Sequence, residues 1–189
     1  MKRSLVRGNN QVLRVPEHLL KKDPAVVQKE GLEKYGEATE IIKDKLYLGS
    51  CFNARDKEFL ISCNISHILN VAEEIEMKEQ EGVLSQKLII FDSPKKDSNP
   101  DCFLGQFQSV VEAIQNIIDS NGVCLIHCMH GRSRSAGGVI AYLMETEKIS
   151  YSDALAKIQQ MRPLVKPNMY INKYLSQLNS LRFEQSKIN

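Results

Sequence analysis

The sequence predicts an α/β protein with a single mixed, largely parallel sheet of about five strands flanked by helices. Apolar runs of strand length at 65–71, 87–91 and 123–127 alternate with segments of helical periodicity, and parallel strands require such crossover helices. Two shorter apolar segments within 40–49 supply the remaining strands. A chain of 189 residues is long enough for one domain with its own core.

The first expected element is a helix near residues 24–35, within an N-terminal extension that covers residues 1–37. Asp23 can cap this helix, and Pro24 fits its first turn. Two short strands are expected next, within 40–49, because apolar residues lie on both sides of a polar turn.

A helix after these strands is expected to be capped by Ser50 or Asn53 and to end near Ser62. Beyond the strands at 65–71 and 87–91, a polar stretch at 92–101 with two prolines is expected to be a loop.

The second half of the chain is expected to be mostly helical. Apolar side chains recur at helical spacing between 102 and 119, and Asn121-Gly122 ends this helix. After the strand at 123–127 the expected elements are helices at 136–145, 150–161 and 168–183, followed by a tail at 184–189.

Composition excludes several classes of function. The net charge is only +2, so a nucleic-acid or membrane partner is not expected, and no apolar run reaches membrane-spanning length. The five cysteines are odd in number and not closely paired, which predicts reduced thiols and a cytoplasmic or nuclear protein. The four histidines show no metal-ligand spacing, so no metal or other cofactor is expected. The protein is also expected to be a monomer.

The stretch 123–135, Val-Cys-Leu-Ile-His-Cys-Met-His-Gly-Arg-Ser-Arg-Ser, carries the strongest chemical signal. A buried strand delivers Cys128 to a tight loop that runs into a helix, and backbone N–H groups at such a helix start bind a phosphate dianion. The same field favours the thiolate: a free cysteine has a pKa of about 8.5, and cysteines in comparable sites have values of roughly 3.5–7.5. Arg134 adds a planar fork of donors that matches phosphate oxygens, and Gly131 lets the backbone turn sharply.

Chance produces His-Cys-x-x-Gly-x-x-Arg in only about one chain in several thousand of this composition. The motif resembles the signature loop of the cysteine-dependent protein phosphatases, and Gly-Arg-Ser-Arg-Ser-Ala is most similar to their dual-specificity branch. The resemblance extends over residues 38–180 and includes the following segments: Leu46-Tyr47-Leu48-Gly49-Ser50, His67-Ile68-Leu69-Asn70-Val71-Ala72-Glu73-Glu74, Ala141-Tyr142-Leu143-Met144, Arg162-Pro163 and Pro167-Asn168. It departs from the common pattern at Met129 and His130, and the chain has no tryptophan before the expected acid.

This resemblance implies a phosphotyrosine-phosphatase-like fold, with a dual-specificity phosphatase catalytic domain at 38–183. Its substrates are expected to be proteins that carry phosphotyrosine or phosphoserine/threonine. Cys128 is expected to attack phosphorus and form a phosphocysteine. The phosphate-binding residues are expected to be Met129, His130, Gly131, Arg132, Ser133 and Arg134.

Asp92 and Ser135 are further expected catalytic residues, and His127 and Asn70 are expected supporting residues. Asp92 is the expected general acid and base, because it follows the strand at 87–91, which is expected beside the strand of Cys128, and because the resemblance implies an acid at this position. Asp97 and Asp101 of the same loop are the alternatives. Ser135 is placed to hydrogen-bond the Cys128 sulfur. His127 is expected to orient the loop, and Asn70, by resemblance, to hydrogen-bond it from the adjacent strand. Cys124 is expected to be a core residue, or else a partner for oxidised Cys128.

Two alternative functions remain open at this stage. Arg132 and His130 add positive charge that suits a phosphoinositide or an RNA 5′ phosphate, and the same loop also fits a non-catalytic phosphoprotein-binding module. A protein kinase is a further candidate partner, because basic residues followed by Leu13-x-Val15 or Val26-Val27 resemble kinase-docking peptides. Such patterns are common by chance, so a solvated flank is the favoured interpretation of those residues.

Overall fold

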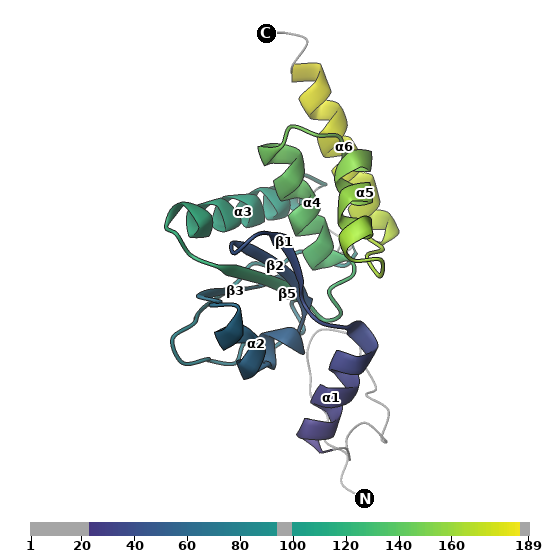
Figure 1. Ribbon diagram of the computed structural model, residues 1–189. Coiled ribbons are helices and arrows are strands. Elements are labelled where there is room, and N and C mark those ends of the chain that lie inside the picture. The colour runs from purple at the N-terminus through teal and green to yellow at the C-terminus, as the bar shows by residue number, and fades with distance from the viewer. Residues whose placement is uncertain (1–22, 94–99, 186–189) are drawn as a thin grey trace, which may run out of the picture.

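The computed structural model describes residues 23–93 and 100–185, and it shows a five-stranded sheet with helices on both faces (Figure 1). In their order across the sheet, the strands are β1 (Thr39–Ile42), β2 (Leu46–Ser50), β5 (Cys124–Cys128), β3 (His67–Asn70) and β4 (Leu84–Lys87). β1 runs antiparallel to β2, and the other three neighbouring pairs are parallel. The predicted α/β class, with a mixed and largely parallel sheet of about five strands, is confirmed.

Alternate side chains of the central strand enter two different cores. Cys124, Ile126 and Cys128 of β5 belong to the larger core, whereas Leu125 belongs to the smaller one, as the two-residue period of a strand requires. The larger core is covered by α3 (Pro100–Asp119), α4 (Arg134–Thr146), α5 (Tyr151–Met161) and α6 (Met169–Gln185), and the smaller by α2 (Lys57–Ser62) (Figure 1).

Helix α4 packs unusually close to its neighbours because two of its residues lack a side chain. A Cβ atom at Gly137 would lie 2.8 Å from Ile171 in α6, and one at Gly138 would lie 3.0 Å from Ile126 in β5. Helix α4 also begins at Arg134, two residues before the predicted start. This places Arg134 and Ser135 in its first turn, where the N-terminal end of the helix dipole acts on them.

The helix predicted near residues 24–35 is confirmed as α1 (Pro24–Tyr35). Asp23 caps it by accepting a hydrogen bond from the Ala25 amide at 2.8 Å, and Gly36 donates back to the Leu32 carbonyl. Within α1 the Val26 side chain is 46% exposed, whereas the Leu13-x-Val15 segment lies outside the described residues.

The prediction that Ser50 or Asn53 caps the next helix is wrong. The Asn53 side chain instead accepts from the Ser50 amide at 2.7 Å, which closes the turn after β2. A short 3₁₀ helix, η1 (Asn53–Arg55), follows, and Asp56 then caps α2 by accepting from the Phe59 amide.

The strand predicted at 87–91 lies earlier in the chain, as β4. β4 is an edge strand with mostly exposed side chains, so it lacks the apolar run by which a buried strand is recognised. The apolar run after it belongs to the core: Ile90 is fully buried, and Phe91 packs edge-on against Phe103 at 6.0 Å. Other helix and strand ends shift by only a few residues.

Candidate active site

The stretch 123–135 folds as the sequence predicted, with β5 leading through a loop into α4. Gly131 has a positive φ of 66°, and a Cβ atom there would lie 2.6 Å from the carbonyl oxygen of Gly49 in β2. Only glycine combines that backbone conformation with so close an approach. Gly131 therefore lets the loop curl against the sheet.

Cys128 ends β5 with its thiol almost completely buried, at 3% exposure. The Ser135 hydroxyl donates a hydrogen bond to Sγ at 3.2 Å. Burial by itself raises the pKa of this thiol, but the Ser135 hydroxyl, the Ser135 and His130 amides and the Arg134 charge together hold the pKa below its ordinary value. The structure thus favours a thiolate at a position shielded from water.

Arg134 points its guanidinium toward two carboxylates. Glu74 accepts from Nη1 at 2.6 Å and from Nη2 at 2.5 Å, and Asp92 Oδ1 lies 3.7 Å from Nε. Burial lowers the pKa of Arg134, but the bond to Glu74 outweighs it, so the pKa is raised and the side chain stays charged. A cavity of about 190 Å³ adjoins this group, lined by Arg134, Glu73, Glu74 and residues 90–93.

Asp92 reaches the site by a different route from the one predicted. It does not follow the strand beside β5, because β3 separates β4 from β5. Instead the chain crosses the end of β3 after β4, with the Ile90 amide donating to the Val71 carbonyl at 3.1 Å, and this brings Asp92 to Arg134. Asn168 holds Asp92 there, since the side-chain amide of Asn168 donates to the Asp92 carbonyl at 2.7 Å and to Asp92 Oδ1 at 2.8 Å.

The two alternative acids are not placed by the structure. Asp97 lies outside the described residues, and Asp101 falls in the first turn of α3, where side chains are not described.

The other loop side chains point to neighbours around the loop. His130 stacks on Tyr35 of α1, with ring centroids 4.3 Å apart, and Arg132 Nε donates to the Leu164 carbonyl at 3.1 Å. Ser133 Oγ accepts from the backbone amide of Asn168 at 3.0 Å. Met129 Sδ lies 3.8 Å from Cys51 Sγ. The loop is therefore held by α1, by the segment before α6 and by the turn after β2.

His127 and Asn70 lie on adjacent strands and have different surroundings from each other. His127 is buried, which lowers its pKa to about 4 and keeps the ring neutral, and its Nδ1 lies 3.3 Å from the Cys128 carbonyl. The Asn70 side chain bonds within its own turn, to the Ala72 amide and the Ile75 carbonyl. Its predicted bond to the phosphate-binding loop is therefore replaced by a role in holding the turn that carries Glu74.

Cys124 is a core residue, and its predicted alternative role as a partner of oxidised Cys128 is wrong. The two residues are four positions apart on one extended strand, which is about 13 Å, and a disulfide requires Cα atoms within about 7 Å. Among the cysteines whose side chains are described, Cys51 lies near Cys128, and its backbone amide donates to the Met129 carbonyl at 3.3 Å. Burial raises the pKa of its thiol to about 11.

Three residues beyond the predicted set belong to the site: Glu74, Asn168 and Arg162. The Arg162 side chain is 3% exposed and ties the loop to the segment after α1. It donates to the Gly131 carbonyl at 3.0 Å, to the carbonyls of Tyr35 and Glu37, and to the Thr39 hydroxyl. All three lie in segments on which the family resemblance rests, and that resemblance was the only signal in the sequence that pointed to them.

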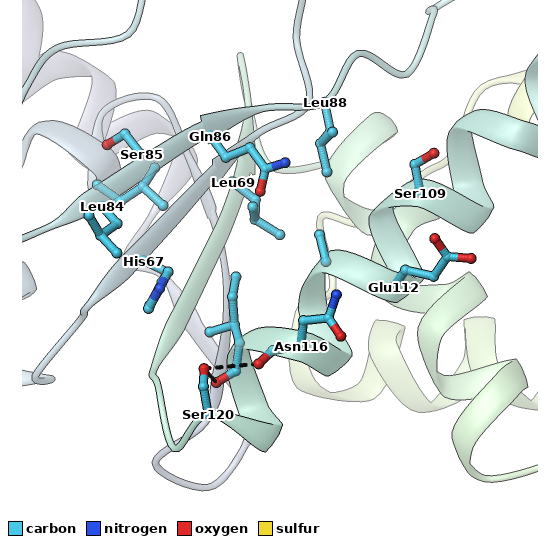
Figure 2. Close-up of a pocket in the computed structure, with 13 residues that line it drawn as sticks. His67, Leu69, Leu84, Ser85, Gln86, Leu88, Ser109, Glu112, Asn116 and Ser120 are labelled. Atoms are coloured by element: carbon cyan, nitrogen blue, oxygen red, sulfur yellow. Dashed lines mark hydrogen bonds between the residues drawn. The ribbon is translucent and has the colours of Figure 1, made fainter.

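A second groove, larger than the cavity at Arg134, has no cysteine or arginine among its lining residues. This groove of about 540 Å³ lies between the edge strand β4 and the second half of α3. Figure 2 shows Gln86 and Leu88 on one side of it and Glu112 and Asn116 on the other. It shares no lining residue with the cavity at Arg134. The cluster around Cys128 and Arg134 is therefore the candidate active site.

The described ranges contain neither a metal-ligand cluster nor a membrane-spanning helix. Within 23–93 and 100–185 no group of three histidine, cysteine or acidic side chains is arranged to hold a metal ion. None of the helices described there has both the length and the apolar character needed to cross a bilayer.

Comparison with known proteins agrees with the geometry. The curated relative Mpk3 of Drosophila melanogaster, a dual specificity protein phosphatase, is 32% identical over 147 residues, which cover 77% of this chain and 35% of that protein. This chain therefore spans about a third of that relative's length.

Two solved structures share the fold. The crystal structure of human DUSP28 superposes with a TM-score of 0.67 at 26% identity, covering 76% of this chain and 93% of that one. A human tyrosine phosphatase-like serine/threonine/tyrosine-interacting protein superposes with a TM-score of 0.66 at 29% identity, covering 78% and 98%. The family described as the dual specificity phosphatase catalytic domain matches residues 46–181. With its signature loop, its sheet order and this match over most of its length, the chain belongs to the dual specificity phosphatase family.

Proposed function

We propose that this protein is a phosphoric monoester hydrolase that removes phosphate from phosphotyrosine and from phosphoserine/threonine in proteins. The observation that carries the proposal is the buried Cys128 thiol at the start of α4, which accepts from the Ser135 hydroxyl at 3.2 Å. A thiolate stabilised in this way, beside an arginine and a curled loop of amides, suits attack on a phosphate ester.

In the first step the Cys128 thiolate attacks phosphorus, a sulfur–phosphorus bond forms and the ester bond breaks. The amides of 129–134 and the Arg134 guanidinium stabilise the equatorial oxygens, as positive groups do in other phosphoryl transfers. The leaving oxygen takes a proton from the Asp92 carboxyl group, which lies beside Arg134.

In the second step water attacks the phosphocysteine and gives its proton to Asp92. The sulfur–phosphorus bond breaks and Cys128 leaves as a thiolate. The Ser135 hydroxyl, already bonded to this sulfur, stabilises the leaving thiolate. The reaction returns each group to its starting state, with inorganic phosphate as the second product.

A binding module without activity is the main competing function. The fold alone does not exclude it, since one similar structure is described as a phosphatase-like interacting protein. Enzyme chemistry is supported because the nucleophile, the arginine and an acid are all present, and because the pKa of Cys128 is lowered. A protein that only binds phosphate has no use for a thiolate.

A phosphoinositide or RNA 5′ phosphate receives less support. That alternative relied on Arg132 and His130 as extra positive charges facing the substrate. The Arg132 side chain turns to the Leu164 carbonyl, and the His130 ring lies against Tyr35. Burial, followed by the charges of Arg132, Lys34 and Arg134, also lowers the pKa of His130, so its ring tends to be neutral.

The proposal is tested by phosphate release from a panel of phosphotyrosine, phosphothreonine and phosphoserine peptides, with a phosphoinositide and a 5′-triphosphate RNA as comparison substrates. We expect the enzyme to hydrolyse the phosphotyrosine peptides and the phosphoserine and phosphothreonine peptides. Its kcat/KM for these peptides should be higher than for the phosphoinositide and the RNA. Preference for the lipid or the RNA would reassign the substrate class, and binding of phosphopeptides without phosphate release would indicate a binding module.

Replacing Asp92 by asparagine is expected to lower kcat/KM by roughly 10²–10⁴-fold for alkyl phosphates, the usual contribution of a general acid. The loss is expected to be small for aryl phosphates with good leaving groups, which need little protonation. In the wild type, kcat/KM should rise with pH as Cys128 becomes a thiolate and fall as the acid ionises. Asparagine does not titrate, so the falling limb should flatten while the rising limb stays.

The matched comparison is with Asp97→Asn and Asp101→Asn. If the Asp92 variant keeps the falling limb and one of these loses it, the acid lies later in the same segment of the chain and the assignment to Asp92 is wrong.

A further inference from the structure

The His130 ring of the phosphate-binding loop is packed against the N-terminal helix. It stacks on the Tyr35 ring at the end of α1, with ring centroids 4.3 Å apart and ring planes 19° from parallel. His130 is one of the two residues at which the loop departs from the common family pattern. The stack connects the loop to a helix that lies outside residues 46–181, the part of the chain that matches the family.

Tyr35 is itself held in place by both its backbone and its ring. The Tyr35 carbonyl accepts a hydrogen bond from Arg162 Nη2 at 3.0 Å. The Tyr35 ring also stacks on Phe52 in the turn after β2, with centroids 5.8 Å apart. Gly31 of α1 makes room for this arrangement, because a Cβ atom there would lie 2.3 Å from the Phe52 ring. Tyr35 is therefore presented to His130 from a fixed position.

The backbone of His130 serves the active site, although its side chain turns to α1. Burial raises the pKa of the Cys128 thiol, but Ser135, Arg134 and the His130 amide act against burial and together lower the pKa. A hydrogen bond weakens steeply as its angle departs from linear, so the direction of the His130 amide matters. The ring and the amide belong to one residue, and a ring that is held in place restricts how that amide can turn.

We propose that Tyr35 is a positioning residue, which stacks on the His130 ring and thereby fixes the direction in which the His130 amide points at the Cys128 sulfur. This inference rests on the proposed phosphatase function and gives α1 a part in it. The stacked imidazole is neutral near pH 7, because burial, followed by the charges of Arg132 and Lys34, lowers the pKa of His130.

Two other roles for Tyr35 predict different effects of its removal. A ring that only packs α1 against the protein affects stability and leaves the ionisation of Cys128 unchanged. A ring that contacts the substrate affects KM, and does so more for aryl than for alkyl phosphates. A positioning residue acts before any substrate binds. Its removal therefore changes the ionisation of Cys128 in the free enzyme and lowers kcat/KM for aryl and alkyl phosphates alike.

The test is Tyr35→Ala in the full chain. The first measurement is the rate of alkylation by iodoacetamide as a function of pH, located on Cys128 by tandem mass spectrometry, and the second is kcat/KM for one aryl and one alkyl phosphate. We expect the midpoint of the alkylation profile to move up by roughly 0.5–1 pH unit, the effect of weakening one of several hydrogen bonds to a charged group. Below that midpoint, kcat/KM should fall roughly 3–10-fold for both substrates, because a smaller fraction of the thiol is ionised.

Conservative variants separate the ring from the rest of the side chain. Tyr35→Phe keeps the stack, so its alkylation midpoint and its kcat/KM should stay within about twofold of the wild type. Tyr35→Leu keeps apolar volume without a ring and should behave like Tyr35→Ala. An unchanged midpoint in both ringless variants, a loss confined to KM for the aryl phosphate, or a Tyr35→Phe enzyme as impaired as Tyr35→Leu would overturn the inference.

Phe59→Ala is the matched control, because it removes another aromatic pair at a distance from the loop. Phe59 lies edge-on to Tyr47, with centroids 5.9 Å apart, and packs on the smaller core. Its replacement should lower the thermal unfolding temperature and leave the alkylation midpoint of Cys128 where it is in the wild type. A midpoint that moves as far in Phe59→Ala as in Tyr35→Ala would show a general effect of lost stability and would contradict positioning.

A double-mutant cycle tests whether Tyr35 acts through His130. His130→Ala should cause the same loss as Tyr35→Ala, and the double variant should stay within about twofold of either single variant. Additive losses would show that Tyr35 acts by another route and would overturn the inference. A wild type that releases no phosphate, but whose alkylation midpoint still depends on Tyr35, would contradict the proposed function and support the positioning role, so the two failures are distinguishable.

Discussion

Replacing Cys128 by serine is expected to reduce phosphate release by at least about 10⁴-fold, the scale on which loss of a covalent nucleophile is felt. The effect follows from the difference in acidity between a thiol and a hydroxyl group. The surroundings of Cys128 lower the pKa of a thiol that ordinarily ionises at about pH 8.5, whereas a serine hydroxyl stays protonated in the same place. Oxyanion binding should change by no more than a few-fold, since the donors are backbone amides and Arg134.

Turnover of an aryl phosphate and calorimetric binding of tungstate measure these two properties separately. In the wild type, the rising limb of kcat/KM should lie below the range in which an ordinary thiol ionises, because the pKa of Cys128 is lowered in the folded protein. Cys63→Ser is the matched control, as Cys63 lies outside the site and is only partly buried. Substantial turnover by Cys128→Ser would remove Cys128 as the nucleophile.

Replacing Arg134 by lysine is expected to lower kcat/KM by roughly 10²–10⁴-fold although the charge is retained. Lysine is a single point charge, so it cannot hold Glu74 with two parallel bonds and still offer two donors to phosphate. The loss should fall mainly on kcat, because the equatorial oxygens gain charge in the transition state.

Arg55→Lys, the same exchange outside the phosphate-binding loop, should keep kcat/KM within about twofold of the wild type. Steady-state kinetics on one aryl and one alkyl phosphate, with thermal unfolding as a check on the fold, measures the difference. Near-normal kcat/KM in Arg134→Lys would contradict a role that depends on the planar fork.

The parts of the site that the sequence revealed are those made within one short stretch. Cys128, Gly131, Arg134 and Ser135 lie within eight consecutive residues, and the strand, turn and helix that bring them together are local structures. The thiol, the curled backbone and the Ser135 bond could therefore be predicted from spacing and residue type.

The partners of these residues come from elsewhere in the chain, and spacing carries no information about them. Glu74 meets Arg134 across 60 residues, and Arg162 meets Gly131 across 31. Such pairs depend on how the sheet is ordered, which the apolar pattern alone does not define. The apolar pattern also explains the error in the position of Asp92. Asp92 was expected to follow a strand at 87–91, whereas the strand in the structure is β4, which lies at the sheet edge and has no apolar pattern.

Arg162 has a consequence for which part of the chain can fold as a unit. Two of its buried donors end on the Tyr35 and Glu37 carbonyls, which a fragment beginning at residue 38 does not contain. Each buried donor left without a partner costs about 1–3 kcal/mol, a large share of the roughly 5–15 kcal/mol by which a domain is stable. The Tyr35 ring, which lies against His130, would be lost with them. We therefore expect the smallest autonomous fragment to begin at or before Asp23, so that it contains the whole of α1 together with the phosphate-binding loop that Tyr35 of α1 contacts.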